Sequence, residues 1–205
     1  MVIGGGEAAG AKARACAAAG AEVTVIATVL DAGLRELATA GCIRHVARPY
    51  RPGDLEGALL AYATADDPET VALLREEAER ARVLLNVIDT PRASSFIAPA
   101  VVSRGELTIA VGTGGASPGL SAALRRRLEG EFGPEYGPFV AILGAVRRAL
   151  AGEHGRTEVL GALLASPLLD LVRRRDWKAV DGLLGSVGGE ALTLARLGVG
   201  PEQLG

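Results

Sequence analysis

The chain has 205 residues, of which 49% are hydrophobic and 22% are charged, and its formal net charge at pH 7 is −2. This composition supports a real hydrophobic core and excludes a disordered chain. The slightly negative charge and the 3% aromatic content argue against nucleic-acid and membrane-surface partners, which need basic patches and stacking platforms. The two cysteines form no CxxC pair, so we expect no metal site. The charged residues Glu7, Lys12 and Arg14 rule out an N-terminal signal peptide or membrane span, and we expect a cytoplasmic protein.

Up to about residue 112, short apolar runs alternate with helical stretches, which predicts a parallel sheet with crossover helices. The predicted strands are Val2–Ile3, Glu22–Ala27, Ile43–Ala47, Leu59–Ala63, Val83–Ile88 and Leu107–Val111. The predicted helices are Ala8–Ala19, Leu30–Ala40 and Pro68–Ala81. The last has a clear start, with Asp67 as a cap and Pro68 in the first turn. The first strand is unusually short, so we expect a truncated start and weak edge pairing there.

From Ser117 onward the chain is predicted to be almost wholly helical. Ser117-Pro118 opens the first helix, and Gly133-Pro134 separates it from a second, which runs from about 135 to 150. Three leucines mark one face of the first helix: Leu120, Leu124 and Leu128. The predicted fold class is therefore α/β, with a Rossmann-type parallel-sheet domain at 1–112, a connecting segment at 113–150 and a helical C-terminal domain at 151–205.

The first candidate site is the segment GGGEAA at residues 4–9, which has the form GxGxxA between a predicted strand and a predicted helix. Gly4 permits a tight turn, Gly6 lets the backbone approach a pyrophosphate, and Ala9 keeps helix and strand close. The free amides of the helix start, at Glu7 and Ala8, favour phosphate binding. The segment predicts a dinucleotide site, with a purely structural turn as the alternative.

The next strand ends at Ala27-Thr28, where the acidic ribose ligand of many such sites is missing and Thr28 offers a hydroxyl instead. No arginine stands there to bind a 2′-phosphate, so we expect NAD rather than NADP. A Walker A site is excluded because the chain has no Gly-Lys dipeptide, and no tyrosine precedes a lysine by four residues, as a short-chain dehydrogenase requires. By position, His45 and His154 are structural or surface residues.

Two further segments carry chemistry. Asp89 ends the strand containing NVID, at the sheet edge where open α/β sheets bind ligands. It is suited either to act as a general base or to cap the turn at Thr90-Pro91, and position alone leaves both open. Residues 112–118, GTGGASP, form a second glycine-rich loop before a helix. Its amides suit a carboxylate or phosphate, and the alternative is an ordinary turn with Ser117 as N-cap.

Several separated motifs occur in a recognisable order: GGGEAAGAK, GAEVTVIA, ADDPE, NVID, SFIAPA and TGGASPGLSAALRRRLE. Over about residues 1–150 the chain resembles the siroheme synthase N-terminal family of precorrin-2 dehydrogenases and sirohydrochlorin ferrochelatases, in its stand-alone form. The resemblance implies NAD-dependent oxidation of precorrin-2 to sirohydrochlorin, with ferrous iron insertion in bifunctional members. It also implies a homodimer in which the segment 113–150 serves dimerisation and the tetrapyrrole site.

The resemblance implies roles for individual residues as well. Asp89 falls on the family's key aspartate and is expected to be catalytic, accepting the proton that precorrin-2 loses. Thr64 and Asp66 join the cofactor residues, although this chain has ATAD where AATD is commoner. The residues expected to bind the polycarboxylated tetrapyrrole are Asn86, Arg92, Arg104, Thr113, Gly114, Gly115, Ser117 and Arg125. The alternatives are an NAD-sensing regulatory module without catalysis and an oxidoreductase of another substrate.

Overall fold

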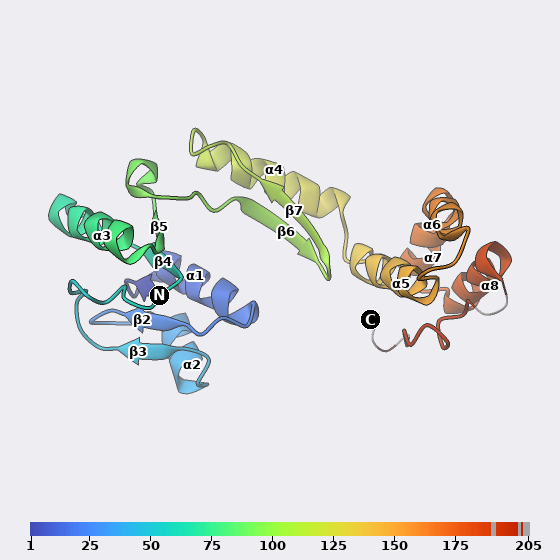
Figure 1. The fold of residues 1–205 in the computed structure, drawn as a ribbon, viewed down its shortest axis with the longest axis horizontal. Helices are drawn as coiled ribbons and strands as arrows, with labels where there is room; N and C mark the ends of the chain where they lie inside the picture. The colour runs from blue at the N-terminus through green and yellow to red at the C-terminus, as the bar shows by residue number, and fades with distance from the viewer. Residues whose placement is uncertain (190–191, 201, 203–205) are drawn as a thin grey trace. The chain divides into compact units, whose positions relative to one another are not determined.

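The computed structural model describes residues 1–189, 192–200 and 202. The chain forms two compact units, Met1–Ala98 and Pro99–Gly205 (Figure 1). Within the part of the chain that is described, none of the helices has the length and apolar character needed to cross a membrane.

The first unit contains a five-stranded parallel sheet with the strand order β3-β2-β1-β4-β5. Its strands are β1 (Val2–Ile3), β2 (Thr24–Ile26), β3 (Arg44–Val46), β4 (Leu60–Ala63) and β5 (Leu84–Val87). Its helices are α1 (Glu7–Ala18), α2 (Ala32–Thr39), α3 (Pro68–Ala81) and the short 3₁₀ turn η1 (Pro91–Ala93). This is the order of a doubly wound Rossmann sheet, and the predicted fold class is confirmed. The order reverses between β1 and β4, and ligands of such sheets bind beside the carboxyl ends of the strands at that point.

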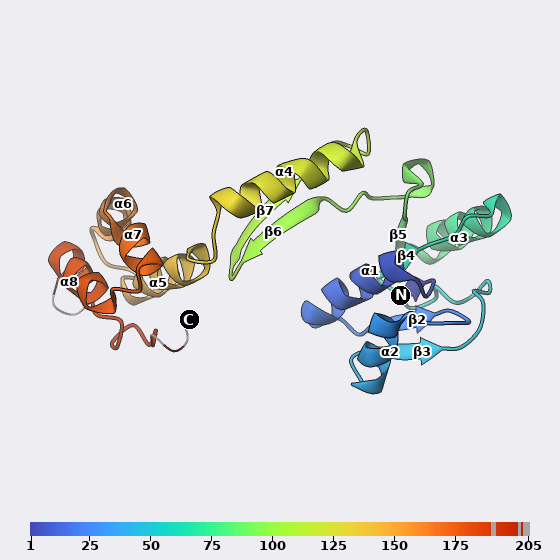
Figure 2. The same ribbon diagram turned by 180° about the vertical axis from the view of Figure 1, so that it is seen from behind.

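The short strand β1 is the centre of this sheet. The expectation of weak edge pairing is wrong, because Val2 and Ile3 pair with both β2 and β4. The two side chains point to opposite faces, as they must in a strand. Val2 packs in a cluster with α1 and α2, and Ile3 packs in a cluster with α3, so helices cover both faces (Figures 1 and 2).

Helix α3 forms where its sequence predicts it. The carboxylate of Asp67 accepts a hydrogen bond from the Thr70 amide at 2.7 Å, and Pro68 occupies the first turn. The helix ends at Arg82, whose backbone is left-handed with φ of 57°. Leu74 and Ala78 are buried against the sheet, which fixes the face that α3 turns toward solvent.

The second unit begins with an antiparallel hairpin followed by helices. Its elements are β6 (Ala100–Arg104), β7 (Leu107–Val111), α4 (Pro118–Glu131), α5 (Tyr136–Ala149), α6 (Arg156–Ala165), α7 (Leu168–Arg173) and α8 (Trp177–Gly188). The helical character predicted after residue 117 is confirmed. Helices α5 to α8 enclose a separate hydrophobic core that includes Ile142, Leu163 and Leu184.

The assignment of Leu107–Val111 to the parallel sheet is wrong. This strand follows β6 after only Gly105 and Glu106, and so short a connection joins antiparallel neighbours. The hairpin belongs to the second compact unit, so the first unit ends at Ala98 rather than near residue 112. The functional division of the chain into 1–112, 113–150 and 151–205 stays a prediction.

Candidate functional site

The glycine loop after β1 contains two glycines that the fold requires. Gly4 has φ of +117°, and a Cβ atom there would lie 1.8 Å from the Thr64 hydroxyl oxygen and 3.7 Å from the Cβ of Ala9. A Cβ atom on Gly5 would lie 1.8 Å from the backbone oxygen of Val29. The loop is therefore packed closely against the residues that follow β2 and β4, and neither glycine has room for a side chain.

Gly6 differs from its neighbours, because a Cβ atom built there meets no atom of the described residues within 4 Å. Gly6 is also the N-cap of α1 and supplies no side-chain cap. Glu7 and Ala8 begin the helix in exposed positions, whereas Ala9 is buried. The helix therefore turns uncapped amides toward open space, as a phosphate site requires.

The end of β2 lies beside this loop. The amide of Asp31 donates to the Gly5 carbonyl at 2.7 Å, and the Asp31 carboxylate caps α2 through the Leu34 amide, also at 2.7 Å. Ala27 is buried, and its carbonyl bonds the His45 ring at 2.9 Å, which agrees with a structural role for that histidine. Thr28 is exposed and keeps the position predicted for a ribose contact.

A pocket of about 640 Å³ lies at the carboxyl ends of β4 and β5, beside the start of α1. Its size falls within the range of small-molecule sites. Five residues singled out from the sequence line it: Ala8, Thr64, Asp66, Asp89 and Arg92. The remaining wall comes from α3, η1 and the residue after β5, chiefly from Val71, Ala72, Arg75, Ile88 and Ala93. The structure thus brings predicted cofactor, catalytic and substrate residues to one hollow.

Asp89 lies on the pocket wall with an unusual backbone. Its φ is +60°, a region that non-glycine residues visit rarely and that aspartate tolerates better than most. Throughout the described residues its carboxylate accepts no hydrogen bond, so the alternative role of capping the turn is not realised. A strained, exposed and unpartnered carboxylate in a pocket is typical of a functional group.

Ser94 holds the turn that carries Asp89. Its hydroxyl accepts from the Val87 amide at 2.9 Å and lies 3.2 Å from the carbonyls of Val87 and Thr90. Ser95 likewise bonds the amide of Leu85 through its hydroxyl and the carbonyl of Leu85 through its own amide. The two serines occupy the free edge of β5 in place of another strand. Their hydrogen bonds fix the loop that runs from the end of β5 to Ser94.

Asn86 has a role in this loop rather than on the pocket wall. The side chain is buried, and its amide nitrogen donates to the Phe96 carbonyl at 2.9 Å. This hydrogen bond holds the segment that returns along β5, and the substrate contact expected of Asn86 stays a prediction.

In the second unit, the loop 112–117 is closed by its own hydroxyl groups. The Thr113 hydroxyl accepts from the Ser117 amide at 3.1 Å and lies 3.2 Å from the buried Ser121 hydroxyl. Gly114 and Gly115 have φ of 62° and 82°, and Ser117 caps α4 through the Leu120 amide. The capping role predicted for Ser117 is present. The tetrapyrrole contacts expected of these residues stay a prediction.

Arg104 and Arg125 find partners within the second unit. The Arg104 guanidinium donates to the carbonyls of Phe132, at 2.9 Å, and Glu129, at 3.1 Å, at the end of α4. Arg125 forms an ion pair with the side chain of Glu129 one turn away. Both guanidinium groups thus hold α4, and the tetrapyrrole contacts expected of Arg104 and Arg125 stay a prediction.

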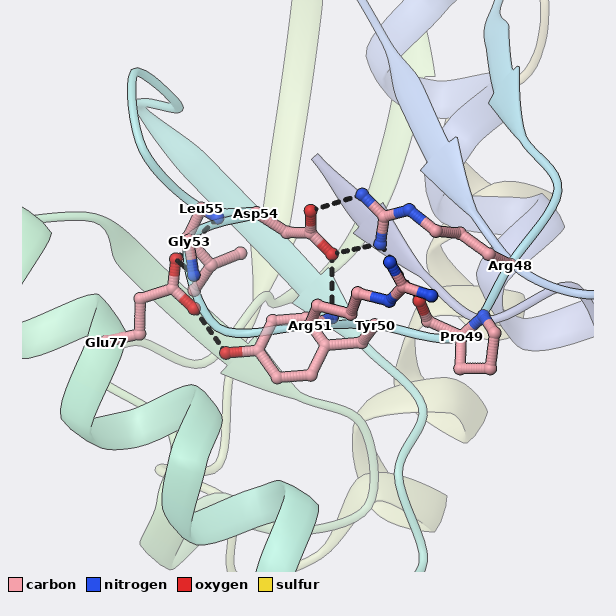
Figure 3. A network of polar contacts seen from close by, with 8 residues as sticks. All are labelled: Arg48, Pro49, Tyr50, Arg51, Gly53, Asp54, Leu55 and Glu77. Carbon is pink, nitrogen blue, oxygen red and sulfur yellow. Dashed lines mark hydrogen bonds and ion pairs between the residues drawn. The ribbon is translucent and has the colours of Figure 1, made fainter.

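A buried network that the sequence did not reveal holds the chain between β3 and β4 against α3 (Figure 3). Glu77 is 3% exposed and accepts hydrogen bonds from the Tyr50 hydroxyl and from the amides of Gly53 and Leu55, at 2.9 and 2.8 Å. The pKa of Tyr50 is raised, mainly because the hydroxyl is shielded from water and secondly because it donates to Glu77. The network fixes α3, the helix that forms one wall of the pocket.

Asp54 lies in the same segment, and its carboxylate accepts two hydrogen bonds from the Arg48 guanidinium, at 2.6 and 2.7 Å. The hydrogen bond from Arg48 is the main reason that the pKa of Asp54 is lowered. A lowered pKa in the folded state means that the carboxylate stabilises the fold above the ordinary aspartate pKa of about 3.9 and loses this effect as the pH falls.

Asp54→Asn is therefore expected to lower the free energy of unfolding by about 1 kcal/mol at pH 7. The difference from the wild type should shrink as the pH falls below about 4, because the wild-type carboxyl group then becomes neutral as well. Thermal unfolding followed by circular dichroism across this range measures both. Glu56→Gln, which breaks the exposed pair with Arg80, is the control and should change little. A difference that stays constant at every pH would contradict the role given to Asp54.

Comparisons with known proteins bear on both units. Residues 1–100 match the family model described as putative NAD(P)-binding, and residues 104–131 match the one described as sirohaem biosynthesis protein central. Siroheme synthase 3 of Aeromonas hydrophila is 40% identical over 147 residues, which are 72% of this chain and 31% of that protein. The chain belongs to the siroheme synthase N-terminal family.

Other members of the family extend the match. The siroheme synthase of Chromobacterium violaceum is 36% identical over 180 residues, 86% of this chain and 38% of that protein. The chain thus spans between 31% and 38% of the length of these two curated relatives. Among solved structures, the one named SirC, precorrin-2 dehydrogenase, matches with a TM-score of 0.67 and 20% identity, over 88% of this chain and 92% of that one. At this identity the likeness shows the shared fold.

Proposed function

We propose that this protein oxidises precorrin-2 to sirohydrochlorin with NAD as the hydride acceptor, in siroheme biosynthesis. The observation that carries the proposal is the pocket in which the start of α1 and the unpartnered carboxylate of Asp89 meet. Curated relatives are named siroheme synthases, and the neighbouring fold is that of a precorrin-2 dehydrogenase, which supports the same reaction.

The residues at the glycine loop fit a dinucleotide. Gly6 leaves open space that fits a pyrophosphate, and the amides at Glu7 and Ala8 are proposed to bind it. Thr28 is exposed for a ribose hydroxyl, and we propose NAD over NADP because no arginine lies beside it in sequence. Bound NAD supplies a hydride acceptor. Thr64 and Asp66 line the pocket next to the loop and are proposed to orient that end of the cofactor.

The oxidation removes two hydrogens from precorrin-2, one as a hydride and one as a proton. We assign the proton to the carboxylate of Asp89, which has no competing partner among the described residues. Arg92, on the same wall, is proposed to bind a substrate carboxylate. The same Asp89 carboxylate is suited to accept pyrrole protons if ferrous iron is inserted as a second substrate.

We also propose that the protein is a homodimer through the segment 113–150. On α4, Leu120 is 51% exposed and Leu124 is 37% exposed, and both lie on the helix face predicted for an interface. Apolar side chains left in water at this spacing are suited to pack against a second copy.

The decisive experiment gives the purified protein precorrin-2 and NAD and follows NADH and sirohydrochlorin by absorbance. Formation of both products in equal amounts is expected. A second arm adds ferrous iron to sirohydrochlorin and follows siroheme. NADH binding without any turnover of precorrin-2 would reject the proposal and favour the regulatory NAD-sensing module.

A further inference from the structure

A second hollow, of about 310 Å³, shares part of its lining with the pocket and extends along α3 and β5. It is lined by the last turns of α3, by β5 and by the segment that follows η1. Three residues line both hollows and therefore stand between them: Arg75, Arg92 and Ala93. This second hollow is called the outer groove below.

The outer groove is strongly basic. Arg75, Arg82 and Arg92 line it, against the single acidic residue Glu79. Arg75 and Glu79 approach each other at 3.7 Å, and their side chains are 52% and 76% exposed, so this ion pair neutralises little charge. The guanidinium groups of Arg82 and Arg92 have no hydrogen-bond or ion-pair partner in the described part of the chain. Three cations with one weakly held counter-charge favour an anionic occupant.

The backbone of β5 is closed to another strand along this groove. Ser94 and Ser95 line the groove, but their hydroxyls bond the backbone of Val87 and Leu85. A peptide that adds a strand to the sheet therefore finds these groups already occupied. What the groove offers to a ligand is its guanidinium groups.

Resting on the proposed function, we infer that the outer groove binds peripheral carboxylates of the macrocycle whose reacting edge occupies the pocket. Carboxylates are the groups that guanidinium binds best, through paired hydrogen bonds. A pocket of about 640 Å³ has to admit both a nicotinamide and a tetrapyrrole edge, so carboxylate arms extend beyond it. Arg75 and Arg92 stand where such arms leave the pocket, and Arg82 lies farther along the groove. The cofactor phosphates are proposed to bind at the start of α1. Ala8, in that first turn, lines the pocket and not the groove, so the groove is left for the macrocycle.

The test uses the double variant Arg75→Gln/Arg82→Gln of the full chain. The KM for precorrin-2 and the Kd of sirohydrochlorin, measured by fluorescence quenching without cofactor, are each expected to rise at least about tenfold. The kcat should change by less than about threefold, because neither residue is assigned to the proton transfer. The Kd of NADH should not change. The charge-preserving variant Arg75→Lys/Arg82→Lys should recover part of the tetrapyrrole affinity.

Arg80→Gln is the matched control. It removes a guanidinium from the same helix, where Arg80 pairs with exposed Glu56 and lines neither hollow. Unchanged tetrapyrrole affinity in the double variant, or an equal loss in the control, would overturn the inference. A loss of affinity confined to NADH would also overturn the inference, because it would show that the groove binds the cofactor. A wild-type protein that binds sirohydrochlorin but forms no NADH from precorrin-2 rejects the proposed function alone, because the binding comparison still decides the groove.

Discussion

Asp89→Asn is expected to lower kcat for precorrin-2 oxidation by about 10²- to 10⁴-fold, the range by which a positioned general base accelerates a reaction. The amide has the size of the carboxylate but accepts a proton poorly. Because asparagine adopts left-handed backbone more readily than other non-glycine residues, the φ of +60° at this position should survive the change. The affinity for NADH should stay close to that of the wild type.

Asp67→Asn is the matched control for this measurement. Asp67 is an exposed aspartate that caps α3 and does not line the pocket, and asparagine caps helices equally well. Rates from single-turnover experiments would separate the chemical step from product release. If Asp89→Asn keeps the wild-type rate in a folded protein, the proton goes to another group and the mechanism proposed above fails.

Much of the site could be predicted because parallel strands deliver their carboxyl ends to one edge. Thr64 follows β4 and Asp89 follows β5, and strand pairing alone places them side by side once the sheet order is known. The order itself follows from the glycine loop, which marks β1 as the strand beside the reversal. Local patterns were therefore enough to locate the pocket.

The network around Glu77 shows what local patterns miss. In sequence, Glu77 lies in the charged run REEAER and looks like a solvated helix position. Its partners Tyr50, Gly53 and Leu55 precede it by 22 to 27 residues and come from an irregular segment with no periodicity to read. Burial of a carboxylate depends on such distant donors, and one sequence does not show them.

The hydrogen-bond partners of the arginines could not be predicted for a related reason. A sequence shows that Arg104 and Arg92 are cations near expected ligand motifs, but not which acceptors lie within reach. Arg104 meets the free carbonyls at the end of α4, whereas Arg92 meets no acceptor among the described residues and lies on the pocket wall. Helix ends left open by the fold thus decide which guanidinium groups remain for a ligand.

The largest effect on folding is expected at Gly5, and the contrast with Gly6 separates structure from binding. Gly5→Ala should lower the free energy of unfolding by about 4 kcal/mol or more, because the methyl group would lie 1.8 Å from the Val29 carbonyl oxygen. Backbone on both sides is fixed by the Gly4 amide on the Ile26 carbonyl and by the Asp31 amide on the Gly5 carbonyl. The clash has no flexible side chain to absorb it.

Gly6→Ala should fold with nearly unchanged stability, since its Cβ meets open space and its φ of −91° suits alanine. The affinity for NADH, measured by fluorescence titration, should nevertheless fall at least about tenfold, because the methyl group would stand where a pyrophosphate must approach the backbone. Thermal unfolding of both variants provides the comparison. If Gly6→Ala binds NADH as the wild type does, the open space at Gly6 is not the phosphate site, and the glycine loop is a turn that the sheet needs for packing alone.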